Sequence, residues 1–234
     1  NNWVSLHHDG TVVLYPMLAS NRRLERRLEL LVALEQRGGF AVSRLLDLSH
    51  HELSGRFLEG TGSVVFDHAC RVAYACLSPR TNADVLAELC EELGYEPFAF
   101  DATDCEGVAV YHTNVLLSIG QRSAIVCAEA VPEAQRVPLL ERLRASGREV
   151  VAIDRAQMAA FAGNALELAA ADGTAVLSMS DRALRSFDAR SLETLRHCVE
   201  RIVAVPVPTI EDLGGGSVRC MLAEVFLPRS AAAR

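Results

Sequence analysis

Apolar positions along this chain alternate between the spacing typical of strands and the spacing typical of helices. The clearest helical pattern covers residues 82–93, where Asn82 can cap the first turn and Gly94 can end the helix. Two β-branched apolar runs precede this helix, and an aromatic run follows it. The stretch therefore predicts two strands, a helix and a third strand.

The same order of elements returns before and after that stretch. The Asp9-Gly10 turn opens the first copy as a hairpin, and a helix follows from Ser20 or Asn21 to the Gly38-Gly39 stop. The other expected helices cover residues 132–146 and 181–200, and the expected strands are 11–15, 40–48, 63–66, 72–76, 98–100, 108–111, 123–127, 149–153, 166–169, 174–177 and 202–205.

Repeating units of about 45 to 50 residues are typical of radial architectures, in which neighbouring units bury each other's faces. Strands within 217–226 would begin a fifth unit that has no helix of its own. A closed ring would then take the rest of this unit from the N-terminus, and because the chain starts at Asn1 without Met we expect an upstream segment to contribute. An open α+β sandwich fits the same pattern, and either architecture makes residues 1–234 one domain.

Composition narrows the kind of partner. The chain has 30 acidic and 23 basic residues, a net charge of −7 and no run of like charge, which argues against nucleic acid and anionic membrane surfaces. No apolar stretch reaches the roughly 18 residues of a membrane span. We therefore expect a small-molecule partner, with homo-oligomer formation left open.

The absence of lysine and of closely spaced cysteine pairs excludes further classes of protein. All 23 basic residues are Arg, which excludes a lysine Schiff base with pyridoxal phosphate and a phosphate-binding P-loop lysine. Seven cysteines without a CxxC pair indicate neither a disulfide framework nor a zinc knuckle, and they favour a cytoplasmic location. His7-His8 and His50-His51 should point apart on strands, so we expect no metal and no cofactor.

Three segments carry candidate chemistry. Cys220 follows three glycines and stands beside the cation of Arg219, a setting that favours a thiolate. His112 ends an apolar run, from which an imidazole can act as acid and base, and Glu59 lies among small residues and can orient it. The structural alternative is a buried cysteine, a strand-end histidine and a solvated loop carboxylate.

These segments resemble a known superfamily. Glu59–Gly62, His112–Asn114 and Gly214–Met221 are similar to the Glu-Gly-Gly, His-x-Asp and glycine-rich cysteine motifs of arginine deiminases. The whole chain resembles the bacterial citrulline-utilisation hydrolases, which are arginine-deiminase-related or amidinotransferase-like members of the pentein (guanidino-group-modifying) superfamily. Further segments of this likeness are Asn1-Asn2-Trp3, Leu14-Tyr15-Pro16-Met17, Asn21-Arg22-Arg23, Ala75–Thr81 and Phe161–Asn164.

The resemblance implies an α/β fold, a five-bladed ββαβ propeller with the active site at its centre. It implies that Cys220 is the nucleophile, that His112 moves protons and that Glu59 holds His112. Arg80 would bind the α-carboxylate of the substrate, and Arg219 is a further candidate for substrate binding. We expect a turn role for Phe161–Asn164.

Two asparagines depart from the deiminase pattern. Asn2 and Asn114 stand where arginine deiminases have aspartates that bind the guanidinium group. An asparagine offers both a donor and an acceptor, which suits a neutral ureido group better than a cation. The expected reaction is therefore cysteine-dependent hydrolysis of citrulline to ornithine through a covalent intermediate. Arginine deiminase, arginine dihydrolase and amidine transfer remain alternatives, as does a non-catalytic binding protein with the same propeller.

Overall fold

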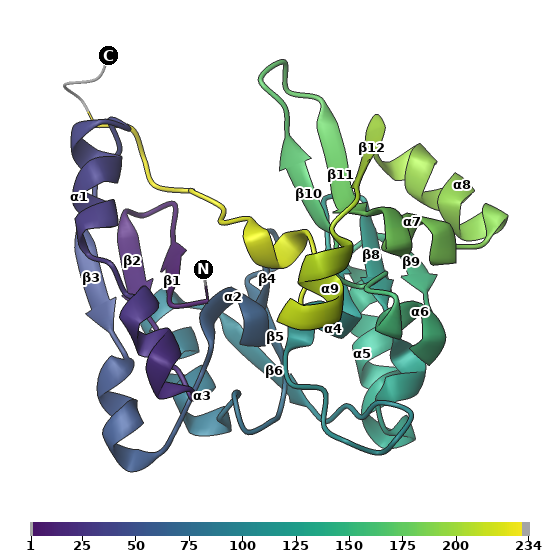
Figure 1. Ribbon diagram of the computed structural model, residues 1–234, viewed down its shortest axis with the longest axis horizontal. Coiled ribbons are helices and arrows are strands. Elements are labelled where there is room, and N and C mark those ends of the chain that lie inside the picture. Colours follow the sequence, from purple (N-terminus) through teal and green to yellow (C-terminus); the bar gives the residue numbers. More distant parts are fainter. Residues whose placement is uncertain (1, 231–234) are drawn as a thin grey trace.

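The chain folds into four three-stranded sheets with one shared topology, as a computed structural model that describes residues 2–230 shows (Figure 1). In each sheet the first two strands form an antiparallel hairpin, and the third strand pairs in parallel with the second. Parallel neighbours need a crossover connection, and helices supply it in every unit. The fold is therefore a mixed α/β fold built from repeated ββαβ units.

The first two units occupy the N-terminal half of the chain. The first contains β1 (Val4–Leu6), β2 (Thr11–Leu14), the 3₁₀ helix η1 (Ser20–Glu25), α1 (Glu29–Gln36) and β3 (Arg44–Asp47). The connection to the second contains η2 (Ser49–Ser54) and α2 (Gly60–Ser63). The second unit contains β4 (Val65–Asp67), β5 (Val72–Cys76), α3 (Ala83–Leu93) and β6 (Glu96–Phe100).

The other two units follow in the same order. The third contains α4 (Thr113–Leu116), β7 (Leu117–Ile119), β8 (Ser123–Val126), η3 (Ala128–Ala130), α5 (Glu133–Ala145), β9 (Glu149–Ala152) and α6 (Arg155–Ala159). The fourth contains β10 (Leu166–Ala169), β11 (Ala175–Ser180), α7 (Asp181–Ser186), α8 (Ala189–Cys198) and β12 (Arg201–Val205). The chain then forms α9 (Pro208–Gly214) and η4 (Arg219–Met221).

Capping explains why α3 falls where the sequence predicts it. The side-chain oxygen of Asn82 accepts hydrogen bonds from the backbone N–H groups of Asp84 and Val85, and Gly94 ends the helix with a φ of 68°. Both devices satisfy backbone groups that the end of a helix leaves unpaired. The prediction of a helix over residues 82–93 is confirmed.

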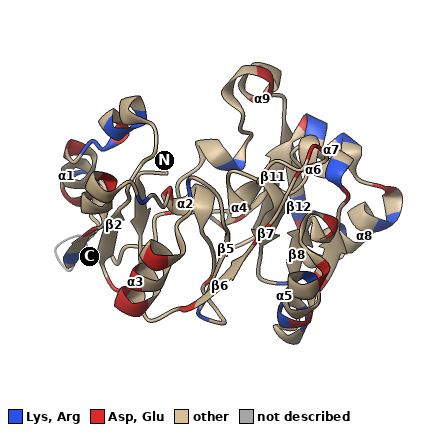
Figure 2. Cartoon of the chain, turned by 90° about the horizontal axis from the view of Figure 1, so that it is seen from below, with Lys and Arg blue, Asp and Glu red and all other residues tan. Residues whose placement is uncertain are grey.

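The second strands β2, β5 and β8 are buried inside the molecule, and the main helices lie outside the sheets (Figure 1). First strands of neighbouring units touch, β4 against β7 and β7 against β10. One large apolar core runs under the second, third and fourth units and includes the fully buried Phe100, Leu117 and Leu139. Strand interiors carry little charge, and acidic and basic residues are interspersed over the outer helices (Figure 2).

The C-terminal segment closes the distance between the last unit and the first. It leaves α9 beside the fourth unit and runs to the edge of the first, where Phe40 and Arg229 form an antiparallel bridge (Figure 1). Expected strands within 217–226 are wrong, because Arg219–Met221 forms a 3₁₀ turn and no strand is assigned there. Among residues 2–230, no helix is both long and apolar enough to cross a membrane.

Further predicted elements differ from the structure, among them the helix expected over 181–200, which is divided into α7 and α8. The helix expected from residue 20 to 37 is split into η1 and α1, and neither Ser20 nor Asn21 caps it, since the residue before η1 is Ala19. Arginines of η1 reach inward to carboxylates instead of following an apolar stripe, and Leu24 is 81% exposed. The strand expected at 40–48 shortens to Arg44–Asp47.

Candidate active site

Several residues of the candidate site share one place in the repeat, the segment that leads into the first strand of a unit. Four of them follow this rule: Asn2 before β1, Glu59 before β4, His112 before β7 and Asn164 before β10. Because the first strands of neighbouring units contact one another, side chains from these positions meet at one end of the strands. Cys220 reaches the same region from the turn η4.

Glu59 is the most heavily bonded side chain of this region. It is completely buried, and its Oε1 accepts a hydrogen bond from the Leu18 backbone N–H at 3.1 Å. Its Oε2 accepts from the guanidinium groups of Arg22 at 3.0 Å and Arg80 at 3.1 Å, and lies 2.9 Å from Nε2 of His112. Two cations thus surround one carboxylate, which lets it stay charged inside the protein.

The hydrogen bond to Glu59 determines the tautomer of His112. An ionised carboxylate only accepts hydrogen bonds, so Nε2 carries the proton and Nδ1 keeps the free electron pair. A Cβ atom placed on Gly62 would lie 2.9 Å from Nδ1 of His112 and 2.7 Å from Nδ2 of Asn2. Only glycine leaves room there, because the side chains of His112 and Asn2 both lie directly against the Cα atom of Gly62.

Burial and charge act in opposite directions on this pair. Burial alone raises the pKa of Glu59, but the hydrogen bond and charge of His112, with Arg80 and the Leu18 N–H, lower that pKa to about 2. Burial lowers the pKa of His112, an effect that Glu59 only partly offsets and that the charges of Arg80 and Arg22 reinforce. At neutral pH the pair is therefore an ionised carboxylate and a neutral imidazole.

His112 reaches this position from a place that the sequence did not predict. The expected strand at 108–111 is wrong, because Val110 N–H bonds the Ala102 carbonyl in a loop and Val108 is 57% exposed. His112 instead precedes the short helix α4 as its N-cap residue. Its neighbour Tyr111 donates a hydrogen bond from its hydroxyl to the carbonyl of Gly215, in the glycine-rich segment before Cys220.

Cys220 is half-buried, and two asparagine amides face its sulfur. Nδ2 of Asn164 lies 3.3 Å from Sγ, and Nδ2 of Asn114 lies 3.9 Å from it. A Cβ atom on Gly216 would come within 3.2 Å of Sγ, so the glycine-rich segment packs directly against the thiol. Glycine favours this close approach, because a Cβ atom would require the cysteine side chain to shift by a few tenths of an ångström.

The amide of Asn114, which lies near the sulfur, has an unpaired acceptor. Its Nδ2 donates to the carbonyl of Thr61 at 3.2 Å, which fixes the orientation of the amide. Its Oδ1 is buried and has no hydrogen-bond partner among the described residues. A buried acceptor without a partner is costly, so a ligand with an N–H group would satisfy it.

Arg80 and Arg219, the two arginines predicted to bind substrate, have different surroundings in the structure. Arg80 contacts Glu59 and keeps 32% of its side chain exposed. Arg219, next to Cys220, donates to the Leu117 carbonyl at 3.2 Å, and burial lowers its pKa. Sequence reasoning gave no role to Arg22, although its motif Asn21-Arg22-Arg23 was part of the family likeness.

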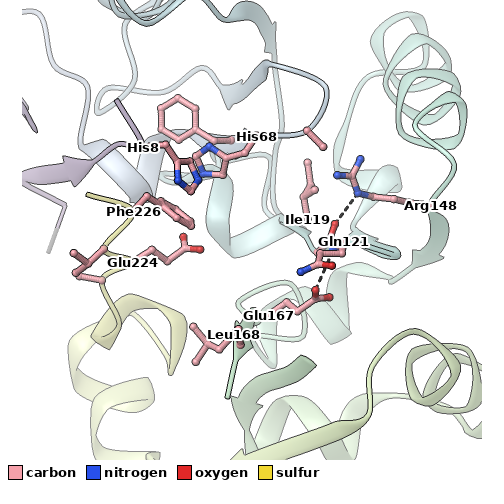
Figure 3. A pocket seen from close by; sticks show the side chains of 15 residues that line it. His8, His68, Ile119, Gln121, Arg148, Glu167, Leu168, Glu224 and Phe226 are labelled. Atoms are coloured by element: carbon pink, nitrogen blue, oxygen red, sulfur yellow. Dashed lines mark hydrogen bonds between the residues drawn. The ribbon is translucent and has the colours of Figure 1, made fainter. Parts of the chain in front are cut away.

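A separate cavity lies at the other end of the same strands. Its volume is about 700 Å³, and it is lined by residues that follow the first strands, such as His8, His68 and Gln121, and by Glu224 and Phe226 (Figure 3). Figure 3 shows Glu167 accepting from the Gln121 backbone at the lower side, below the two histidines. Neither Cys220 nor Glu59 nor His112 lines this cavity.

The adjacent histidines His50 and His51 also differ from their prediction. His50 and His51 lie on the 3₁₀ helix η2 rather than on a strand, and their rings are 4.2 Å apart instead of pointing away from each other. Glu88 joins them, with potential ligand atoms of all three within 4.8 Å of one another. The prediction that His50 and His51 lie on a strand and point apart is therefore wrong.

The fold and this site define a class of protein. Residues 1–227 match the family model described as N,N dimethylarginine dimethylhydrolase, eukaryotic. The chain is a member of the pentein, or guanidino-group-modifying, superfamily, and the resemblance in its sequence motifs is confirmed. Within that superfamily it belongs to the dimethylarginine dimethylhydrolase family.

Solved structures share the fold at low sequence identity. An arginine dihydrolase from the ornithine-ammonia cycle in cyanobacteria, ArgZ, has a TM-score of 0.72 and 18% identity, with 97% of this chain and 33% of that one covered. AgrE with L-arginine has a TM-score of 0.70 and 16% identity, with 96% and 31% covered. The amidinotransferase SxtG of Microseira wollei has a TM-score of 0.62 and 13% identity, with 94% and 65% covered.

The chain spans about a third of the length of ArgZ and AgrE. No curated protein matches the sequence significantly. The family and the structural neighbours are guanidino-group-modifying enzymes, and the likeness to the neighbours concerns the fold.

Proposed function

We propose that this protein is a cysteine-dependent hydrolase that cleaves the ureido C–N bond of citrulline and releases ornithine. Cys220 is the nucleophile, His112 the acid and base, and Glu59 the carboxylate that holds His112. The observation that carries the proposal is the unpaired, buried Oδ1 of Asn114, an amide whose Nδ2 lies 3.9 Å from the Cys220 sulfur. A ureido –NH₂ group would donate to this oxygen while its carbon faces the thiolate.

The charges around the site favour a neutral substrate over a cationic one. Arg22 and Arg80 both contact Glu59, so two positive charges compensate one negative charge before any substrate binds. Asn114 adds an acceptor without charge, and Asn2 meets His112 over Gly62. A guanidinium group would bring a further cation to these groups, whereas a ureido group brings none.

The chemistry proceeds in two balanced halves. His112 takes the thiol proton of Cys220 at Nδ1, the resulting thiolate forms an S–C bond to the ureido carbon, the C–N bond breaks, and His112 passes this proton to the departing nitrogen. Water then attacks the thiocarbamoyl carbon, His112 takes a proton from this water and returns it to the sulfur as the S–C bond breaks, and the carbamic acid released decomposes to its amine and carbon dioxide. Together the halves convert citrulline and water into ornithine, ammonia and carbon dioxide without a cofactor.

Arginine dihydrolysis is the second candidate. The family model and the structural neighbours, among them ArgZ described as an arginine dihydrolase, favour it. Amidine transfer is a further variant, as the amidinotransferase SxtG indicates. A binding protein without catalysis is supported less well, because it would not need a buried acid and base beside a free thiol.

The ratio of ammonia to ornithine distinguishes these reactions. The purified full-length protein is incubated separately with citrulline, with arginine, and with arginine plus an amine acceptor such as glycine. Citrulline hydrolysis gives one ammonia per ornithine, arginine dihydrolysis gives two, deimination gives ammonia without ornithine, and transfer gives ornithine only with the acceptor. Ornithine from citrulline in the one-to-one ratio supports the proposal, and product from arginine alone transfers the assignment to the second candidate.

We also propose that the four units belong to a closed five-unit propeller. Four units contribute their site residues from the segment before the first strand, and Cys220 occupies the equivalent place for a fifth, although residues 217–226 are not a strand here.

The seven cysteines are free thiols, which supports a reducing, cytoplasmic setting.

A further inference from the structure

Asn164 was expected to serve only a turn, yet its side chain is buried against the reacting sulfur. It is completely inaccessible to solvent. Its Nδ2 lies 3.3 Å from Sγ of Cys220, and its Oδ1 lies 3.6 Å from the same sulfur. Both ends of one amide thus face the thiol.

The orientation of this amide is fixed by a neighbour. Nδ2 donates to the backbone carbonyl of Asn114 at 2.9 Å, so nitrogen and oxygen cannot exchange places without losing that bond. The remaining N–H is directed to the sulfur at the shorter of the two distances. A thiol can donate to Oδ1, whereas a thiolate can accept from Nδ2, and the amide therefore serves both protonation states.

The backbone that leads to Asn164 adopts a strained conformation. Phe161 adopts a φ of 64°, a left-handed conformation that a bulky side chain rarely takes. A Cβ atom on Gly163 would lie 2.4 Å from the Val115 carbonyl oxygen, so the turn is pressed against α4. The Asn164 N–H closes the turn by bonding the Phe161 carbonyl at 2.9 Å. A turn needed only to connect α6 and β10 would not require this strain.

We infer that Asn164 is a catalytic residue, which donates a hydrogen bond from its side-chain amide to the thiolate of Cys220. The inference rests on the proposed role of Cys220 as nucleophile. A charge-assisted hydrogen bond favours the thiolate over the thiol in the resting enzyme. It also stabilises the sulfur as it leaves when water opens the thiocarbamoyl intermediate.

Alkylation of Cys220 tests this role without any substrate. The rate of modification by iodoacetamide is measured from pH 5 to 10, with the modified cysteine identified by peptide mass spectrometry. For Asn164→Ala we expect the pH midpoint at Cys220 to rise by about one to two units, because the thiolate loses its charge-assisted donor. For Asn164→Asp the rise should be larger, because a carboxylate would face the thiolate.

Ser118→Ala is the matched control. The Ser118 hydroxyl donates to the Ala165 carbonyl at 2.9 Å, so its loss loosens the same turn without removing a group from the sulfur. We expect this variant to lower the melting temperature and to keep the wild-type midpoint. An unchanged midpoint in Asn164→Ala, or an equal shift in Ser118→Ala, would overturn the inference and leave Asn164 a structural residue.

The assay also separates this inference from the proposed function. If citrulline is not a substrate but the midpoint still moves in Asn164→Ala, the donor role stands and only the substrate assignment fails. If citrulline is hydrolysed and the midpoint does not move, the proposed function stands and the inference about Asn164 fails.

Discussion

The Nε2 atom of His112 lies 2.9 Å from Oε2 of Glu59, and both residues are buried. They are separated by more than fifty positions and come from the segments before β4 and β7. In the proposed mechanism, this contact leaves Nδ1 of His112 as the nitrogen that exchanges protons with substrate and water. Most of the expected behaviour of the enzyme follows from it.

Replacing Glu59 by Gln should reduce kcat/KM for citrulline by about 10²- to 10⁴-fold. The amide can no longer stabilise a protonated His112, and it can hold the ring in the wrong tautomer. Steady-state kinetics check this, with thermal unfolding to confirm that the variant is folded. Glu25→Gln is the matched control, because Glu25 also pairs with Arg22 but is partly exposed, and its activity should stay near wild type.

Adding one methyl group at Gly62 should disable the site. In Gly62→Ala the new Cβ would meet His112 at 2.9 Å and Asn2 at 2.7 Å, closer than van der Waals contact allows. A displacement of this kind typically costs about 100-fold in kcat. In Gly214→Ala the Cβ meets only Ile210 at 3.6 Å, so that variant should retain activity. Equal losses in the two variants would show that Gly62 has no special place at the site.

Substrate choice should change with Asn114. An uncompensated polar contact costs about 1–3 kcal/mol, so wild type should prefer citrulline over arginine by roughly 5- to 150-fold in kcat/KM. In Asn114→Asp we expect the preference to narrow or reverse, since a carboxylate attracts guanidinium and repels the ureido oxygen. The ratio of kcat/KM values is measured, because a general loss of activity cancels in it. Full citrulline selectivity in the variant would mean that Asn114 does not select the substrate.

Stability should fall in acid because of a histidine away from the catalytic cysteine. Burial, with the charges of nearby residues, lowers the pKa of His7 to about 4 from the usual 6.5. The unfolded chain therefore binds this proton first, and stability is lost as the pH falls from about 6.5 to 4, by at most roughly 3 kcal/mol.

Thermal unfolding between pH 7 and 4 measures this effect. The His7→Gln variant should show a shallower fall in melting temperature than wild type, whereas His197→Gln, at an exposed position, should follow the wild-type curve. A His7→Gln curve parallel to wild type would assign the acid sensitivity to other groups.

Local signals in the sequence predicted the repeat well. Local residues determine both ends of the helix over 82–93, since the Asn82 side chain caps its N-terminus and the Gly94 backbone caps its C-terminus. The strand at 166–169 is also confirmed with the expected bounds. Errors arose where apolar residues face a partner that is not adjacent in sequence. Val110 alternates as a strand residue would, but it packs against the core from a loop that bonds Ala102.

The sequence identified only some residues of the candidate site, because other contacts there join residues that are distant in sequence. Glu59, His112 and Cys220 stand in motifs that resemble a family, so their identity is visible in the sequence. The contacts of Arg22 with Glu59 and of Asn164 with Cys220 join residues 37 and 56 positions apart. Nothing in the spacing of residues encodes such contacts, because they depend on how separate units pack at one end of their strands.

Release of ornithine from citrulline by wild type and by Cys220→Ser tests the central claim most directly. Cys105→Ser, which changes an exposed thiol in the same way, is the control. The account predicts that wild type and Cys105→Ser form ornithine at the same rate and that Cys220→Ser loses at least about 10³-fold in kcat. Ornithine formation by Cys220→Ser at a rate close to wild type, or none by the wild-type protein, would contradict it.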